Sequence, residues 1–278
     1  MVGDSVSPDI GLSAVVFDWA GTVVDFGSRA PMGAFVELFA SQGVEIAIAE
    51  ARVPMGLPKW DHIKALGQLP RVAAAWRAAH GQPFTDRDVD VLYEIFTPMN
   101  IRAIPQHADL IAGVPAMLAD LRARGMKVGS TTGYNREIMA VLAPLAAQQG
   151  FAPDNLICAG DVPENRPSPL GMYRCFVDLA VWPGHRVVKV DDTVPGLMEG
   201  RNAGCWTVGV IASGNEMGLS QAEWESLEAG ARVERRVAAS ARLSVAKPDY
   251  CIDTVAELPA IVDAINRRLA DGERPAPA

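Results

Sequence analysis

Acidic residues follow two apolar segments of the chain, at positions where they could bind a metal ion. The apolar run 14–17 ends in Asp18, and the run 186–190 ends in the pair Asp191 and Asp192. Such runs are typical of buried strands, and carboxylates from two strands could together hold Mg²⁺, which prefers oxygen ligands. The pattern therefore predicts a Mg²⁺ site where these two segments end.

Three further groups could hold the anion that such an ion attracts. Thr132 and Gly133 follow the strand-like segment 126–131, and Arg166 lies in the polar loop 160–169. A hydroxyl, a backbone N–H and a guanidinium are suitable donors to a phosphoryl group. Ligands of open parallel sheets bind outside the carboxyl ends of the strands, so these groups would meet if the segments are parallel strands.

The segments that must position these groups alternate between strand-like and helix-like patterns. Strand-like runs occur at residues 14–17, 126–131, 186–190, 206–211 and 249–253. Helix-like segments lie between or after them, at residues 114–125, 196–204 and 255–270. This alternation predicts an α/β fold with a doubly wound parallel sheet.

Residues 31–104 depart from this alternation. Helical spacing occurs here at residues 31–43, 70–81 and 85–96, and no strong strand pattern interrupts it. We therefore expect a helical domain inserted between the first and second strands of the sheet. The predicted boundaries are 29–104 for this insertion and 1–28 plus 105–278 for the discontinuous core.

The composition limits the classes of partner. The net charge of −8 argues against a nucleic-acid-binding protein. No apolar stretch approaches the length of about 18 residues that a membrane span requires, so no membrane partner is expected. The four cysteines are scattered without metal-ligand spacing, which predicts reduced thiols and a cytoplasmic location. A small anionic substrate remains compatible with this charge, because it needs only a local positive site.

Four stretches resemble, in order, the motifs of the haloacid dehalogenase superfamily. They are FDWAGTVVD (17–25), GSTTGY (129–134), Arg166 and VDDTVPGLMEGRNAG (190–204). The resemblance implies a Rossmann-like core of the haloacid dehalogenase type, an inserted helical cap, and Mg²⁺-dependent chemistry through an aspartyl-phosphate. It implies that Asp18 is the nucleophile, and that Asp18, Asp192 and the carbonyl of Ala20 hold the metal.

Ala20 stands where phosphatases of this superfamily carry a second acid, which protonates the departing alcohol. The stretches 18–31, 51–66 and 130–137 resemble instead the phosphonoacetaldehyde hydrolase family, or phosphonatases, which carry alanine there. That resemblance implies cleavage of a carbon–phosphorus bond, giving acetaldehyde and phosphate in 2-aminoethylphosphonate degradation. It places a Schiff-base lysine at Lys59, and it places Met55 and His62 at the substrate.

The residues around Lys59 are suited to lowering the pKa of its ammonium. Pro58 predicts that Lys59 lies in the first turn of a helix, where the helix dipole disfavours a cation. Apolar neighbours, Met55 among them, could desolvate the amine, and His62 at i+3 would share its helix face and could shuttle protons. A lower pKa would supply the neutral amine that attacks a carbonyl.

Several features leave alternatives open. The family commonly dimerises, and the cap helices, especially 31–43, could form a homodimer interface or could pack inside the cap. Ser28 is either a linker residue or a substrate contact. Gly196 stands where a further acid is usual, and either Asp191 or Glu199 could compensate.

Two other functions compete with the phosphonatase interpretation. One is a phosphate-ester phosphatase or phosphomutase, against which the missing acid at Ala20 weighs. The other is a non-catalytic phosphometabolite-binding protein. Against that second function weighs the joint presence of five residues: Asp18, Lys59, Thr132, Arg166 and Asp192.

Overall fold

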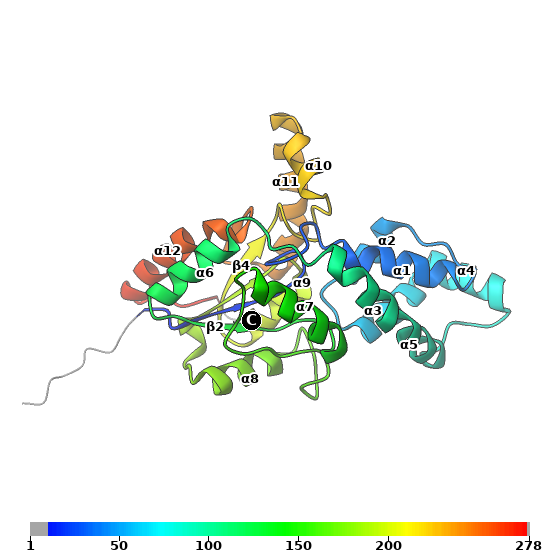
Figure 1. Cartoon of the computed structure of the whole chain (residues 1–278), viewed down its shortest axis with the longest axis horizontal. Coiled ribbons are helices and arrows are strands. Elements are labelled where there is room, and N and C mark those ends of the chain that lie inside the picture. Colours follow the sequence, from blue (N-terminus) through cyan, green and yellow to red (C-terminus); the bar gives the residue numbers. More distant parts are fainter. Residues whose placement is uncertain (1–10, 277–278) are drawn as a thin grey trace, which may run out of the picture.

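A parallel sheet forms the centre of the larger of two units in the computed structural model, which describes residues 11–276 (Figure 1). Its strands are β1 (Ala14–Phe17), β2 (Lys127–Ser130), β3 (Val187–Asp191), β4 (Trp206–Val210) and β5 (Tyr250–Ile252). Their order across the sheet is β2-β1-β3-β4-β5, and every pairing is parallel. The predicted doubly wound sheet is confirmed, and its chain order reverses beside β1.

Helices cover both faces of the sheet, which is why a central strand such as β1 is apolar along its whole length. Val15 and Phe17 of β1 pack into a cluster with side chains of α6, α7 and α12, whereas Ala14 and Val16 pack into a second cluster with α8. The helices of this unit are α6 (Val114–Ala123), α7 (Arg136–Gln148), α8 (Leu170–Leu179), α9 (Val194–Asn202) and α12 (Leu258–Ala270). Short 3-10 turns lie at Ile104–Gln106, Gly184–Arg186, Ser244–Ala246 and Val255–Glu257.

A separate helical unit, called the cap below, lies between β1 and β2 in the sequence and to the right of the sheet in Figure 1. Its helices are α1 (Ala30–Ala40), α2 (Ile48–Arg52), α3 (Lys59–Gln68), α4 (Pro70–His80) and α5 (Asp86–Ala103). They share their own hydrophobic cluster, which includes Phe35, Leu38, Ile63 and Phe96. The apolar stripe of α1 therefore faces the interior of the cap. Helix α5 extends beyond the predicted end at residue 96, through Pro98, because Met99 and Asn100 continue its buried face.

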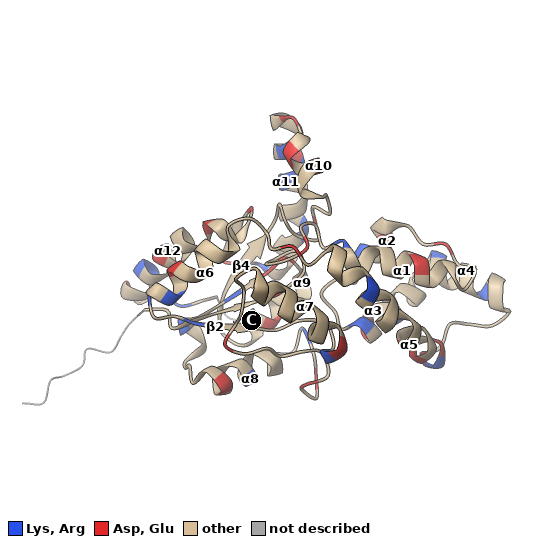
Figure 2. Cartoon of the chain, in the orientation of Figure 1, with Lys and Arg blue, Asp and Glu red and all other residues tan. Residues whose placement is uncertain are grey.

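A helical pair, α10 (Gln221–Ser226) and α11 (Ala229–Leu243), projects from the sheet unit (Figure 1). The base of α11 is anchored by Ala239 and Leu243, which pack with Leu197 of α9. Acidic and basic residues are interspersed along the chain in both units and in this pair (Figure 2). Among the described helices, none combines the length and the apolar character needed to cross a membrane.

Candidate active site

A small cavity lies where the carboxyl ends of β1 and β2 face the cap. Side chains or backbone of Asp18, Ala20, Thr132, Gly133 and Arg166 line it from the core, and Met55 and Lys59 line it from the cap. Its free volume is about 20 Å³, enough for about one water molecule. The structure therefore brings together the predicted phosphate-binding residues, the predicted nucleophile and the predicted Schiff-base lysine.

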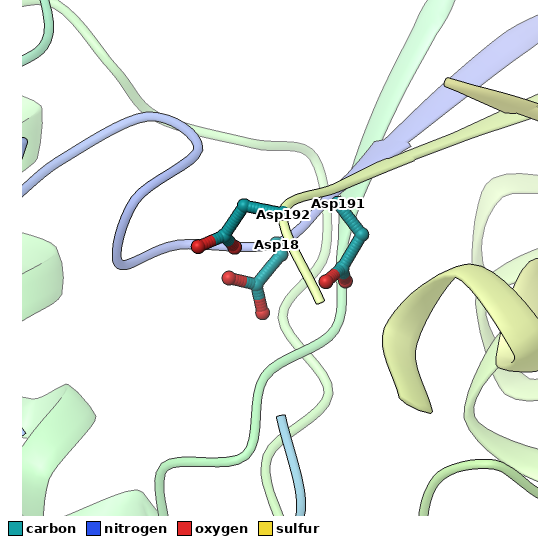
Figure 3. A group of neighbouring side chains, drawn as sticks. All are labelled: Asp18, Asp191 and Asp192. Carbon is teal, nitrogen blue, oxygen red and sulfur yellow. The ribbon is translucent and has the colours of Figure 1, made fainter. Parts of the chain in front are cut away.

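Three buried carboxylates converge beside this cavity. Asp18 directly follows β1, Asp191 ends β3, and Asp192 follows it (Figure 3). One oxygen from each carboxylate lies within 4.8 Å of the others. β1 and β3 pair in parallel with Phe17 opposite Val190, so their carboxyl ends coincide and the acids must meet.

Two buried cations partly balance these acids. Arg166 donates from Nη1 to Asp18 Oδ1 at 2.8 Å and from Nε to Glu199 Oε2 at 3.0 Å. Lys189 Nζ lies 3.2 Å from Asp191 Oδ2 and 3.3 Å from Glu199 Oε2. Thr131 completes this network, since its hydroxyl accepts from Lys189 and donates to Glu199.

Burial and mutual repulsion disfavour ionisation of Asp18 and Asp192. Burial, followed by the charge of Asp191, raises the pKa of Asp18 to about 6, although Arg166 acts in the opposite direction. Burial raises the pKa of Asp192 well above its usual range, and the charges of Asp18 and Asp191 add to that effect. A nearby cation would relieve both penalties.

The site therefore fits a divalent cation. When ionised, the four carboxylates of Asp18, Asp191, Asp192 and Glu199 exceed the charges of Arg166 and Lys189 by two, and a doubly charged ion would cancel this excess. Ionised carboxylates with oxygen donors are the ligand set that hard cations prefer. Asp18 and Asp192 are two of the ligands expected from the sequence, and Ala20 lines the same cavity.

Asp191 occupies the space that an acid at position 196 would need. A Cβ atom on Gly196 would lie 2.0 Å from Asp191 Oδ2, so no side chain fits there beside that carboxylate. Glu199 instead turns toward Arg166 and Lys189. Of the two residues that could compensate for Gly196, Asp191 is thus the one within the convergent acids.

Lys59 begins α3 and is buried from solvent in the cavity wall. Its Nζ lies 3.8 Å from Met55 Sδ and 5.0 Å from the ring centroid of Tyr134. Burial lowers the pKa of Lys59 to about 8, against the opposing charge of Asp18. At pH 7 a group with this pKa is neutral in about a tenth of molecules, far more often than an exposed lysine. The amine is thus prepared to attack a carbonyl group.

His62 does not line the cavity, unlike its predicted neighbours. Its Nε2 lies 2.8 Å from the carbonyl oxygen of Ala51, and its ring stacks on Phe35 at 3.9 Å. Burial, with the charge of Lys59 as the next cause, lowers the pKa of His62 well below its ordinary value. The i+3 spacing placed His62 near Lys59, but packing within the cap directs the ring inward.

Two cavity residues were not assigned firmly from the sequence. Tyr134 is buried against Lys59, and its aromatic ring within the GSTTGY stretch was the available signal. Ser28 also lines the cavity, with a φ of +50° that is uncommon outside glycine. Of its two possible roles, the structure therefore places Ser28 at the cavity, in the segment that leads into the cap.

The cap and core approach each other closely around the cavity. A Cβ atom on Gly133 would lie 2.9 Å from the carbonyl oxygen of Leu57, and one on Gly56 would lie 2.3 Å from Thr193 Oγ1. Two cap–core contacts thus have no room for a methyl group. Backbone from the cap segment 54–58 therefore lies directly on the loops that follow β2 and β3.

The fold and the site define the class of protein. A model of haloacid dehalogenase-like hydrolases matches residues 12–204, which include β1 to β3 and the convergent acids. The chain belongs to this class of hydrolases.

Within this class, comparison with individual proteins is more specific. The chain is 49% identical over 264 residues to the phosphonoacetaldehyde hydrolase of Paraburkholderia xenovorans, covering 95% of this chain and 99% of that protein. It is 48% identical over 276 residues to that of Aeromonas hydrophila, covering 98% of both chains. A crystal structure of a phosphonoacetaldehyde hydrolase-like protein from Oleispira antarctica superposes with a TM-score of 0.93, at 42% identity and with 95% and 96% coverage. The chain belongs to the phosphonoacetaldehyde hydrolase family.

Proposed function

We propose that this protein hydrolyses the carbon–phosphorus bond of phosphonoacetaldehyde to acetaldehyde and phosphate. The observation that carries the proposal is that Lys59, a buried amine with a lowered pKa, lines the same cavity as Asp18, while Ala20 offers no acid. An aldehyde needs an amine to activate it, whereas a phosphate ester needs an acid for its leaving oxygen. The names of the relatives support the same substrate.

Lys59 would handle the carbon part of the substrate. Its neutral amine adds to the aldehyde, water leaves, and a protonated imine forms. When the carbon–phosphorus bond breaks, its electron pair moves into the imine, which becomes an enamine. The enamine takes a proton on carbon, and hydrolysis then releases acetaldehyde and regenerates the Lys59 amine. Met55 and Tyr134 would keep this amine desolvated.

Asp18 would accept the phosphoryl group. Its carboxylate attacks phosphorus opposite the breaking bond, and water later hydrolyses the acyl phosphate. Arg166, Thr132 and the Gly133 N–H would bind the phosphoryl oxygens. A divalent cation, proposed as Mg²⁺ and held by Asp18, Asp192 and the Ala20 carbonyl, would offset the repulsion between the nucleophile and the phosphonate.

We also propose that residues 29–104 act as a cap domain that opens and closes over a core of residues 1–28 and 105–278. Residues 1–10 and 277–278 of that core lie outside the described part. The separate hydrophobic cluster of the cap supports this division. Asp25 supports it too, because its carboxylate accepts from the Ala30 N–H at 2.8 Å and lies 3.3 Å from His107 Nδ1. Asp25 thus contacts both chain segments that connect the cap to the core. Closure would exclude water from the enamine.

We also propose a cellular location, a metabolic role and an oligomeric state for the protein. A cytoplasmic location is supported by four free cysteines, which suit a reducing compartment. A role in 2-aminoethylphosphonate degradation follows from the substrate. We propose a homodimer through the cap helices; if α1 takes part, it would use its outer face, with Gly33 and Glu37, because its apolar stripe is buried within the cap.

Trapping with borohydride tests the proposed function. Incubation with phosphonoacetaldehyde and Mg²⁺ should release acetaldehyde and phosphate, and borohydride should stop turnover and leave an adduct on Lys59. An ethyl adduct would mark an imine trapped after bond cleavage, and a phosphonoethyl adduct one trapped before it. Asp18→Ala should give only the phosphonoethyl adduct, and Lys59→Ala should give neither. Turnover of phosphate esters with no adduct, or binding without turnover, would refute the proposal.

A further inference from the structure

Arg52 connects the cap to the core through one guanidinium group. It ends α2, and its Nη1 donates to the Gly27 carbonyl at 2.9 Å, to the Asn215 carbonyl at 3.2 Å and to Asn215 Oδ1 at 3.1 Å. Its Nη2 donates to the Gly218 carbonyl at 3.1 Å. One cap side chain thus binds both the connection that enters the cap and a core loop that follows β4.

That core loop also holds one of the convergent acids. The Asn215 N–H donates to Asp192 Oδ2 at 2.7 Å, and a Cβ atom on Gly214 would lie 2.7 Å from Asp192 Cβ. The loop is further tied to the first motif, because Ser213 Oγ donates to the Gly21 carbonyl at 2.9 Å. Residues 213–218 therefore form the layer between Arg52 and the Asp192 carboxylate.

The other end of the cap segment reaches the reacting groups. Arg52 is followed by residues 53–58, which include Met55 and Gly56 in the cavity wall, and then by Lys59. The Met55 N–H donates to the Arg52 carbonyl at 3.1 Å, so this segment turns directly off the anchored residue. Movement of Arg52 away from the core would carry the Lys59 backbone with it.

The contact leaves little freedom for either partner. Gly218 has a φ of +65°, and a Cβ atom there would lie 2.7 Å from both Cζ and Nε of Arg52. Its guanidinium offers donors in a rigid planar fork, which can bind carbonyls on several sides at once. A lysine ammonium at this position could not reach the Gly27 and Gly218 carbonyls with the same geometry.

We propose that Arg52 is a positioning residue that fixes the Lys59 segment over the core and, through Asn215, holds the Asp192 carboxylate in place. Arg52 does not touch the cavity. It acts through Lys59 on one side and Asp192 on the other, so that the amine and the acid site are aligned only when the cap is closed. The proposal rests on the proposed carbon–phosphorus cleavage for its kinetic readout.

The test compares Arg52→Ala and Arg52→Lys with Arg71→Ala as a matched control. Arg71 donates from Nε to Glu50 at 2.6 Å and from Nη2 to the Glu45 carbonyl at 2.9 Å, all within the cap. Removing it deletes comparable hydrogen bonds but no cap–core contact. Asn215→Ala is a milder fourth variant. It loses the Oδ1 acceptor of Arg52 and the Nδ2 donor to Glu216, and it keeps the N–H that holds Asp192.

The expected signature separates alignment from folding. Arg52→Ala should still form the imine, but the trapped adducts should shift from ethyl to phosphonoethyl. Its kcat for phosphate release should fall at least about tenfold, which is the change expected from losing one charge-assisted hydrogen bond. Arg52→Lys should resemble Arg52→Ala, and Asn215→Ala should shift in the same direction by less. Arg71→Ala should keep the wild-type adduct ratio and kcat.

A readout independent of activity completes the test. Hydrogen exchange at the Asn215 and Gly218 amides should accelerate at least about tenfold in Arg52→Ala and remain unchanged in Arg71→Ala. Equal adduct ratios and equal exchange in the two alanine variants would overturn the role of Arg52. If wild-type protein gave no adduct and no phosphate, the proposed function would fail, and the exchange comparison would still decide whether Arg52 holds the loop.

Discussion

Replacing Gly56 by alanine should separate the cap from the core by about 1 Å. The new Cβ atom would lie 2.3 Å from Thr193 Oγ1, whereas ordinary contacts begin at 3.4 Å. Thr193 cannot easily yield, because its hydroxyl donates to Asp191 Oδ1 at 2.7 Å and accepts from the Gly196 N–H. The cap segment that carries Lys59 should therefore move instead.

The expected cost falls mainly on catalysis. A misplacement of about 1 Å between reacting groups can lower a rate about 100-fold. The φ of +92° at Gly56 adds a backbone penalty of about 1 kcal/mol for any L-residue. We thus expect kcat for phosphate release to fall about 100-fold, while the free energy of unfolding falls by only about 1 to 2 kcal/mol.

Gly81→Ala is the control for the backbone penalty alone. Gly81 ends α4 in the same cap with a φ of +75°, and a Cβ atom on it would have no other atom within 4 Å. Its alanine variant should lose similar stability and keep wild-type kcat. Phosphate release measured by a coupled assay, with urea unfolding on the same samples, decides the matter. A Gly56→Ala enzyme that retains kcat, or that loses no more than Gly81→Ala, would refute the close-contact reasoning.

Three further predictions follow from the charges around the cavity. Because burial lowers the pKa of Lys59 to about 8, kcat/KM should rise about tenfold per pH unit below pH 8 and level off above it; a plateau reached only near pH 10.5 would contradict this. The Asp18 pKa is raised from 3.8 to about 6, so in metal-free protein the stability that Asp18 contributes below pH 4 is lost as the pH rises through 6. Mg²⁺ should therefore raise the melting temperature more at pH 7 than at pH 5, and an equal rise at both would count against a site at Asp18. Glu199→Gln removes the charge that faces Arg166 and should lower the free energy of unfolding by about 3 kcal/mol, measured by urea denaturation. An unchanged denaturation midpoint would show that the ion pairs of Glu199 make no net contribution to stability.

The sequence by itself determined the strands and the residues that end two of them. Runs such as 14–17 are apolar throughout because both faces of the sheet are covered, and this signal is local. The acids, Thr132 and Arg166 were predicted to meet because parallel strands place their carboxyl ends together, which follows from topology alone. Lys59 was found because the surrounding stretch resembles a family, whereas an isolated lysine carries no such information.

Only the tertiary structure decided which side chains share a space. Asp191 and Glu199 were equivalent candidates in the sequence, and the close approach of Asp191 to Gly196 distinguishes them. His62 had the correct helical spacing, yet Phe35 and the Ala51 carbonyl hold its ring inside the cap. The acceptors of Arg52 lie 25 and more residues away in the sequence, so no local pattern could indicate them. Periodicity and motifs report what a residue's own element does, whereas contacts between elements depend on packing of the whole chain.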